Sequence, residues 1–430
     1  MKRMKTGNVA ATVAWLVGTA WGAPSVQIQS VDCTPDVPHV VTVSYTLSED
    51  AIVTASVLTN GVALSGDALD ALGGDVNRRI RATDAGDVRT LKWFPDTSFE
   101  GHQLDAASVR VELKAWPLES PPDYMVVDLR VASNLCYYAT EDSLPGKIGD
   151  MVYKSDKLVM RKIRAKDVHW VMGTSSNYVN SLGADAPEIS RELVHRVRLT
   201  HDYYIGVYPV TEAQHELIDR QRESASRLPK SAVSFASLRG TDKGSQWPSL
   251  DEDGNLDVAA SHAVDATSWI GKFRSRTGLV WADLPTEAQW EFAARAGEKA
   301  LLPGDEVISA AAVGRYARFG GNLAQPDCEG LTASRATVGS YRPNGWGLYD
   351  VLGNLMEWCL DWQVYWNEIE MDVSAEQVDP FGAKVGTKRQ MRGSYYSAPW
   401  NWTYVSQRQY GYSPETASGI FGFRIVVTLY

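Results

Sequence analysis

Two carboxylates, Asp350 and Glu357, lie on either side of a short stretch that contains Gly353 and Asn354. Carboxylates on one loop repel each other unless a cation or hydrogen-bond donors lie between them. A bound cation is one way to relieve this repulsion. The alternative is a hydrogen-bonded turn in which Glu357 caps backbone amides. The loop is therefore a candidate metal site.

A segment rich in tyrosine and tryptophan follows, from Tyr395 to Tyr412. Such side chains are common anchors in interfaces, because each buries roughly 150–250 Å² and also offers a polar end. The same property lets them stack on sugars. From strand alternation we expect half of them to fill the domain core, with Asn401, Ser406 and Gln407 supplying hydrogen bonds beside the rest. The candidate ligand-binding residues are Tyr395, Tyr396, Ser397, Trp400, Trp402, Tyr404, Tyr410 and Tyr412.

The remaining reactive side chains show no pattern typical of catalysis. The seven histidines lack metal-ligand spacing, and the chain has neither a glycine-rich phosphate loop nor a Gly-x-Ser-x-Gly elbow. Four cysteines allow three pairings, and free thiols are an equal alternative. Their spacing is not that of a zinc site. The cysteines are Cys33, Cys136, Cys328 and Cys359.

From about Lys157 to Tyr430 the chain resembles the formylglycine-generating enzyme family, the sulfatase-modifying factors. The resemblance implies an α+β domain of C-type-lectin-like fold with long loops and modest regular structure. The motifs that carry it are Val171-Met172-Gly173-Thr174, Tyr203 to Thr211, Leu284 to Gly297, Gly345 to Asp350, Gly353 to Trp358, Arg392-Gly393-Ser394 and Gly422-Phe423-Arg424.

The resemblance also assigns metal ligands. Family enzymes bind copper and oxidise a substrate cysteine through two cysteines, which are matched here by Ser397 and Trp402. The family's first calcium site matches the side chains of Asp350 and Glu357 and the backbone carbonyls of Gly353 and Leu355. A second site begins at Asn322 and Leu323, with Asp327 or Glu329 as its remaining ligand. We expect calcium to be structural, and we expect no copper.

Copper(I) requires soft thiolate ligands, which a hydroxyl or an indole cannot replace. Cys359 lies in a core segment and is a poor substitute. We therefore expect a non-catalytic recognition protein that binds a protein, peptide or glycan. One alternative is a divergent oxidase or maturation factor. A second is a variable ligand-binding protein of a diversity-generating retroelement, since such proteins share this fold and diversify this segment.

The motif from Leu284 to Gly297 predicts a helix that belongs to the scaffold. Thr286 and Gln289 form a capping box at its start. Small side chains follow Trp290 on one face, so a partner element can approach closely. Glu291 and Arg295 form an i, i+4 ion pair. Gly297 ends the helix.

Residues 25–116 predict a small all-β sandwich of immunoglobulin or fibronectin type III pattern. Residues 41–48 alternate between apolar and polar side chains, Asn60-Gly61 marks a hairpin, and residues 109–115 alternate again. Residues 117–156 form a linker with the first strand of the next domain, which covers 157–430. Polar stretches such as 231–261 predict surface loops.

The N-terminus predicts export. Residues 1–22 combine Lys2, Arg3 and Lys5 with an apolar run and a small-residue cleavage site, as in a signal peptide. The run is too short to span a membrane, which takes roughly 20 residues. The net charge of −10 argues against nucleic acid as a partner. We therefore expect a periplasmic, cell-surface or secreted protein without a membrane span.

Overall fold

The computed structural model describes residues 23–430 except 35–38, 83–87, 98–105, 176–193, 220–224, 243, 245, 306, 333 and 364–373. The predicted signal peptide, 1–22, lies outside these residues. The chain divides into two compact units. Unit 1 comprises residues 1–126 and 135–150, and unit 2 comprises 127–134 and 151–430. Each unit is described by itself.

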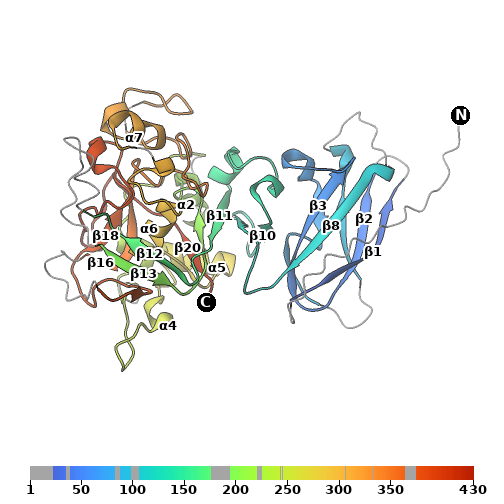
Figure 1. The fold of residues 1–430 in the computed structure, drawn as a ribbon, viewed down its shortest axis with the longest axis horizontal. Helices are drawn as coiled ribbons and strands as arrows, with labels where there is room; N and C mark the ends of the chain where they lie inside the picture. Colours follow the sequence, from blue (N-terminus) through green and yellow to red (C-terminus); the bar gives the residue numbers. More distant parts are fainter. Residues whose placement is uncertain are drawn as a thin grey trace, which may run out of the picture. The chain divides into compact units, whose positions relative to one another are not determined.

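Unit 1 consists of strands joined by short turns (Figure 1). One sheet has the order β1-β2-β7-β5, and another has the order β4-β3-β6, with β8 pairing to β3. The strands are β1 Val26–Cys33, β2 Val41–Leu47, β3 Ala51–Thr59, β4 Val62–Ala63, β5 Leu72–Gly74, β6 Arg78–Ile80, β7 Arg89–Trp93 and β8 Val109–Trp116. Next along the chain are β9 Tyr124–Asp128 and β10 Leu135–Tyr138.

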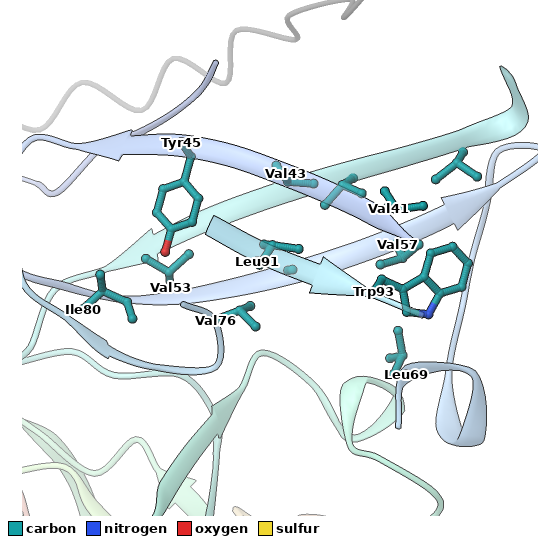
Figure 2. Close-up of a cluster of buried hydrophobic side chains, with 13 residues drawn as sticks. Val41, Val43, Tyr45, Val53, Val57, Leu69, Val76, Ile80, Leu91 and Trp93 are labelled. Atoms are coloured by element: carbon teal, nitrogen blue, oxygen red, sulfur yellow. The ribbon is translucent and has the colours of Figure 1, made fainter. Parts of the chain in front are cut away.

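The two sheets of unit 1 share one hydrophobic core (Figure 2). Tyr45 and Trp93 come from the first sheet, Val53 and Val57 from the second, and all four side chains are buried. The predicted alternation is confirmed in β2 and in the first half of β8, where Val41, Val43, Tyr45, Val109 and Val111 are buried and the residues between them are not. Asn60 and Gly61 both have positive φ and join β3 to β4 as a hairpin.

Unit 2 mixes short strands and helices with long connections (Figure 1). Its strands are β11 Lys157–Ile163, β12 Val168–Met172, β13 His195–Leu199, β14 Tyr203–Gly206, β15 Ala282–Asp283, β16 Met356–Trp362, β17 Gln377–Val378, β18 Arg389–Arg392, β19 Phe421–Gly422 and β20 Val426–Thr428. Its helices are α2 Glu212–Asp219, α3 Phe235–Arg239, α4 Val258–Ser261, α5 Trp269–Thr277, α6 Glu287–Arg295 and α7 Ala310–Tyr316.

The strands of unit 2 form small sheets. One contains the order β11-β14-β20-β15, a second has the order β12-β13-β17, and a third has the order β18-β16-β19. In the third sheet β16 pairs with β18 in antiparallel and with β19 in parallel orientation. These pairings bring the Glu357 segment next to both Arg392 and Gly422.

Helix α6 forms as its sequence predicts. The Thr286 hydroxyl accepts from the Gln289 amide at 3.1 Å, and the Gln289 side chain accepts from the Thr286 amide at 3.1 Å. The helix ends at Arg295, followed by Ala296 and Gly297 with positive φ. It packs against β12, β16 and β18 (Figure 1). Its Glu291–Arg295 pair is buried, with Nε 2.8 Å from Oε1.

The prediction of a surface loop over residues 231–261 is wrong for the first part of this stretch. Helix α3 lies there, and Phe235, Leu238 and Trp247 are buried. The prediction assumed that polar residues are exposed. Arg239 is instead fully buried, and its Nε lies 2.8 Å from Oδ1 of Asp283. Within the described part of the chain, every helix is too short or too polar to cross a lipid bilayer.

Candidate functional site

The segment Tyr395–Tyr412 contains one buried aromatic side chain, one exposed aromatic side chain and five that are half-buried. Tyr404 is buried, with 1% of its surface exposed, whereas Tyr410 is 46% exposed. The prediction that half of the aromatics fill the core is therefore wrong. The segment follows turns and the short helix η11, Trp400–Trp402, so strand alternation does not apply. The remaining predicted residues are half-buried, or exposed in the case of Ser397; they are Tyr395, Tyr396, Ser397, Trp400, Trp402 and Tyr412.

Hydrogen bonds to neighbouring segments hold the backbone of this segment in place at several points. The Tyr396 amide donates to the Asn354 carbonyl at 3.0 Å, and the Gly320 amide donates to the Ala398 carbonyl at 2.8 Å. The Arg392 guanidinium donates to the Ser406 carbonyl at 2.8 Å. A segment without a strand ladder is thereby positioned by its neighbours. Tyr395, Tyr396, Ser397, Trp400, Trp402, Tyr410 and Tyr412 are called the aromatic surface below.

Tyrosines from the two ends of the segment come together. Burial raises the pKa of Tyr412, and the neighbouring hydroxyls of Tyr395 and Tyr410 raise it further. The Tyr412 ring also packs on Phe421, with centroids 4.5 Å apart. The fold thus brings Tyr395 close to Tyr410 and Tyr412, about fifteen residues later in the sequence.

The segment that carries the aromatic surface contributes no exposed charge of its own. Between Tyr395 and Tyr412 the only ionisable side chain besides the tyrosines is Arg408. Arg408 is buried, and its Nε and Nη2 donate to the two oxygens of Glu287 at 2.7 and 3.0 Å. Arg408 is therefore a structural ion-pair partner of Glu287. The surface therefore offers apolar faces, hydroxyls and amides to a ligand.

The thiols do not provide a copper site. The chain has no cysteine after Cys359, so neither Ser397 nor Trp402 has a thiol near it in the sequence. Cys359 is fully buried, and burial raises the pKa of its thiol well above the ordinary value. Cys328 is exposed and accepts from the Ser340 hydroxyl at 3.1 Å. All four cysteines are free. A donor set of hydroxyl, indole and protonated thiol does not fit copper(I).

The Asp350–Glu357 loop is tightly folded. Asp350, Gly353 and Asn354 all have positive φ. A Cβ on Gly353 would lie 2.2 Å from the carbonyl oxygen of Arg318, so only glycine fits there. Asp350 accepts from the Gly339 amide at 2.6 Å and from the Asn354 side chain at 3.3 Å. Burial raises the pKa of Asp350 to about 6, so its charge is poorly stabilised by the protein alone.

Glu357 forms an ion pair with Arg424. Arg424 donates to both of its carboxylate oxygens, at 3.0 and 3.2 Å, and the Trp290 indole donates at 2.8 Å. The donor set therefore fits calcium in part: a cation would stabilise Asp350, whereas Glu357 is already neutralised. Among the described residues no group of three or more His, Cys, Asp or Glu side chains gathers around a point. The Asp350, Gly353, Leu355 and Glu357 calcium site stays a prediction.

The residues of the second predicted calcium site already form hydrogen bonds or ion pairs with other groups of the protein. The Asn322 side chain accepts from the Phe319 amide at 3.0 Å and donates to the Ala317 carbonyl at 2.9 Å. Asp327 accepts from backbone amides of its own loop, and Glu329 pairs with Arg227. The carbonyls of Asn322 and Leu323 accept from Arg318. Sequence reasoning missed Arg318, although an arginine inside an otherwise uncharged run was a signal.

A family model described as "Sulfatase-modifying factor enzyme 1-like domain" matches residues 161–429, more than half of the chain. The chain belongs to this family. The resemblance inferred from the sequence is confirmed, and so is the α+β fold with long loops. The family domain accounts for nearly all of unit 2.

Named relatives cover this domain in part. A formylglycine-generating enzyme of Thermomonospora curvata is 34% identical over 160 residues, which are 36% of this chain and 51% of that protein. The formylglycine-generating enzyme of Streptomyces coelicolor is 33% identical over 199 residues, 42% of this chain and 58% of that protein. The serine/threonine-protein kinase pkn1 of Chlamydia pneumoniae is 31% identical over 235 residues, 54% of this chain and 33% of that protein. The chain thus spans about half the length of these enzymes and a third of the kinase.

Two solved structures are similar at low identity. Variable protein 1 of Treponema denticola has a TM-score of 0.44 and 20% identity, and covers 67% of this chain and 97% of its own. PvdO from Pseudomonas aeruginosa has a TM-score of 0.45 and 18% identity, and covers 63% of this chain and 94% of its own. Likenesses of this size carry no functional argument.

Proposed function

We propose that this chain is a non-catalytic recognition protein that binds an uncharged protein, peptide or glycan through its aromatic surface. The observation that carries the proposal is the exposure of Tyr410 and the partial exposure of Trp400 and Trp402, on a backbone held by Asn354, Gly320 and Arg392. Rigid aromatic anchors lose little conformational entropy when they bind, and neighbouring amides and hydroxyls provide orientation.

The lack of exposed charge within the segment Tyr395–Tyr412 supports an uncharged ligand. The charge of Arg408 is paired with that of Glu287, and the adjoining run Phe319–Gln325 contains no charged residue. A protein of net charge −10 that recognised a charged polymer would need a charged groove at this place. Binding through the aromatic surface should therefore depend little on ionic strength.

A capture experiment tests the proposal. The full chain is applied to arrays of neutral and anionic glycans and of peptides, and each hit is titrated at low and high sodium chloride. Trp400→Ala and Trp402→Ala should each weaken binding at least about tenfold, the loss expected for an anchor residue. Phe94→Ala is the matched control, because Phe94 is an exposed aromatic in unit 1. Ligands retained equally by all variants would refute the aromatic surface.

The second candidate is an oxidase or maturation factor. The names of the formylglycine-generating enzymes among the relatives favour it. It would require a redox centre other than the family's thiolate pair, since Ser397 and Trp402 supply no soft ligand. Fold alone does not decide between the two candidates.

Export and calcium belong to the same proposal. A basic N-terminus followed by an apolar run supports a cleaved signal peptide ending near residue 22, which N-terminal sequencing of the mature protein tests. The buried Asp350 carboxylate, whose pKa is raised by burial, supports a structural calcium ion in its loop.

A further inference from the structure

Arg318 is a fully buried cation surrounded by neutral oxygen atoms. Its Nη1 donates to the carbonyls of Asn322 at 3.1 Å and Gln325 at 2.7 Å, and its Nη2 donates to the Leu323 carbonyl at 3.2 Å. Its Nε donates to the Ser334 carbonyl at 3.1 Å. The Tyr341 hydroxyl lies 3.4 Å from Nη1.

No carboxylate lies within ion-pair distance of Arg318 among the described residues, in contrast to Arg239, Arg392 and Arg424. A buried charge without a counter-ion is costly unless dipoles take the counter-ion's part. Here the carbonyl dipoles of one loop, residues 322–334, do so. Arg318 donates to these carbonyls in place of a strand ladder, and the Asn322 carbonyl also accepts from the Gln325 amide at 2.9 Å.

Two of the carbonyls that accept from Arg318 belong to Asn322 and Leu323, the residues that the family resemblance matches to a calcium site. The Asn322 side chain is already engaged by its own turn. Calcium affinity rises with the number of carboxylate ligands, and this set of oxygens provides none. A guanidinium presents five N–H donors in a planar fork, which suits several converging carbonyls.

We propose that Arg318 is an internal cation that takes the place of a metal ion in this loop, so that residues 322–334 are organised without calcium. The proposal concerns the structure of the loop and does not depend on the proposed function.

The backbone of Arg318 extends this role to neighbouring segments. Its carbonyl accepts from the Asn354 amide at 2.9 Å, and Asn354 in turn accepts from Tyr396. Two residues after Arg318, the Gly320 amide holds Ala398. Arg318 is therefore a positioning residue for the loop beside the aromatic surface, and it makes no contact with a ligand in this account.

Chemical rescue tests the proposal. The melting temperature of full-length wild type, Arg318→Ala and Arg318→Met is measured in EGTA, in a few millimolar calcium, and in about 10 mM guanidinium, with equal urea as the control. Arg342→Ala is the matched variant, because Arg342 is an exposed arginine near Tyr341. The readout is the gap in melting temperature between each variant and wild type under the same condition, which cancels any calcium effect at Asp350.

Arg318→Ala should melt roughly 5–10 °C below wild type, since four loop carbonyls lose the donor that Arg318 provides and a fully buried side chain is truncated. Guanidinium should narrow that gap and calcium should not. Arg318→Met, which fills the space without charge, should not respond to guanidinium, and Arg342→Ala should match wild type. The proposal is overturned if calcium closes the gap, if guanidinium leaves the gap unchanged, or if either Arg318 variant melts within 1 °C of wild type.

Discussion

Arg424 neutralises Glu357 inside unit 2. The guanidinium Nη2 lies 3.0 Å from Oε1 and Nε lies 3.2 Å from Oε2, and both side chains are buried. Arg424 also donates to the carbonyls of Gly206 and Tyr349, both at 2.7 Å. One guanidinium thus ties together β14, the Gly345–Asp350 motif and the Gly353–Trp358 motif.

Glu357→Gln should destabilise unit 2 by about 3–5 kcal/mol, because it leaves Arg424 buried beside a neutral partner. Urea denaturation measures the change. Adding Arg424→Met to Glu357→Gln should cost much less than the sum of the two single changes, since the second removes the orphaned charge. A Glu357→Gln protein within about 0.5 kcal/mol of wild type would show that the pair contributes little.

Tyr404→Ala and Trp402→Ala should separate stability from binding. Tyr404 is buried, so its truncation should cost about 3–5 kcal/mol. Trp402 is half-exposed, and its truncation should cost far less while weakening ligand capture. Thermal unfolding of both variants, read beside the binding titration, checks this. An equal loss of stability in both would place Trp402 in the core.

Chelation should lower the melting temperature of unit 2 if calcium occupies the Asp350 loop. The stabilisation by mass action is about 2.7 kcal/mol when free calcium is about 100 times its dissociation constant. Asp350→Asn should abolish the difference between EGTA and calcium, because the amide cannot supply the charge. Unfolding curves of wild type that coincide in EGTA and calcium would remove this site.

His215 should make stability fall in acid. Its ring stacks on Trp269, and burial lowers the pKa of His215 to about 4 from 6.5, with Asp219 opposing the shift. Between about pH 6.5 and pH 4 the His215 ring is protonated in the unfolded chain and neutral in the folded chain. The part of the free energy of unfolding that depends on neutral His215 is therefore fully present above pH 6.5. It is lost as the pH falls towards 4, and the loss is at most about 3 kcal/mol.

Urea denaturation from pH 7 to pH 4 tests the His215 prediction. His215→Gln should flatten the acid side of the stability profile relative to wild type, because glutamine does not titrate in this range. Parallel profiles for the two proteins would contradict the assigned role of His215.

Local rules predicted the regular elements well. Alternation located β2 and β8, Asn60-Gly61 located a hairpin, and Thr286 located the start of α6. In each case the signal and the structure lie within a few residues of each other, so neighbouring side chains decide the outcome.

Long-range partners escaped prediction. Arg239 made a polar stretch look exposed, yet its partner Asp283 is 44 residues away. In the aromatic segment we predicted that half of the aromatic side chains are buried, but fewer are. The segment follows turns that are held by hydrogen bonds to Asn354 and Gly320. Arg318 satisfies carbonyls of a loop that resemblance had matched to calcium. Burial of a charged side chain depends on partners that sequence spacing does not reveal.

A copper-loading experiment decides whether this chain recognises a ligand without oxidising a thiol. The full-length protein is loaded with copper(I), incubated under air with a cysteine-containing peptide, and the peptide is analysed by mass spectrometry. We expect the cysteine to remain unchanged and the protein to retain no stoichiometric copper, because Ser397 and Trp402 supply no thiolate. Catalytic conversion of the cysteine to an aldehyde, with copper held by the protein, would contradict it.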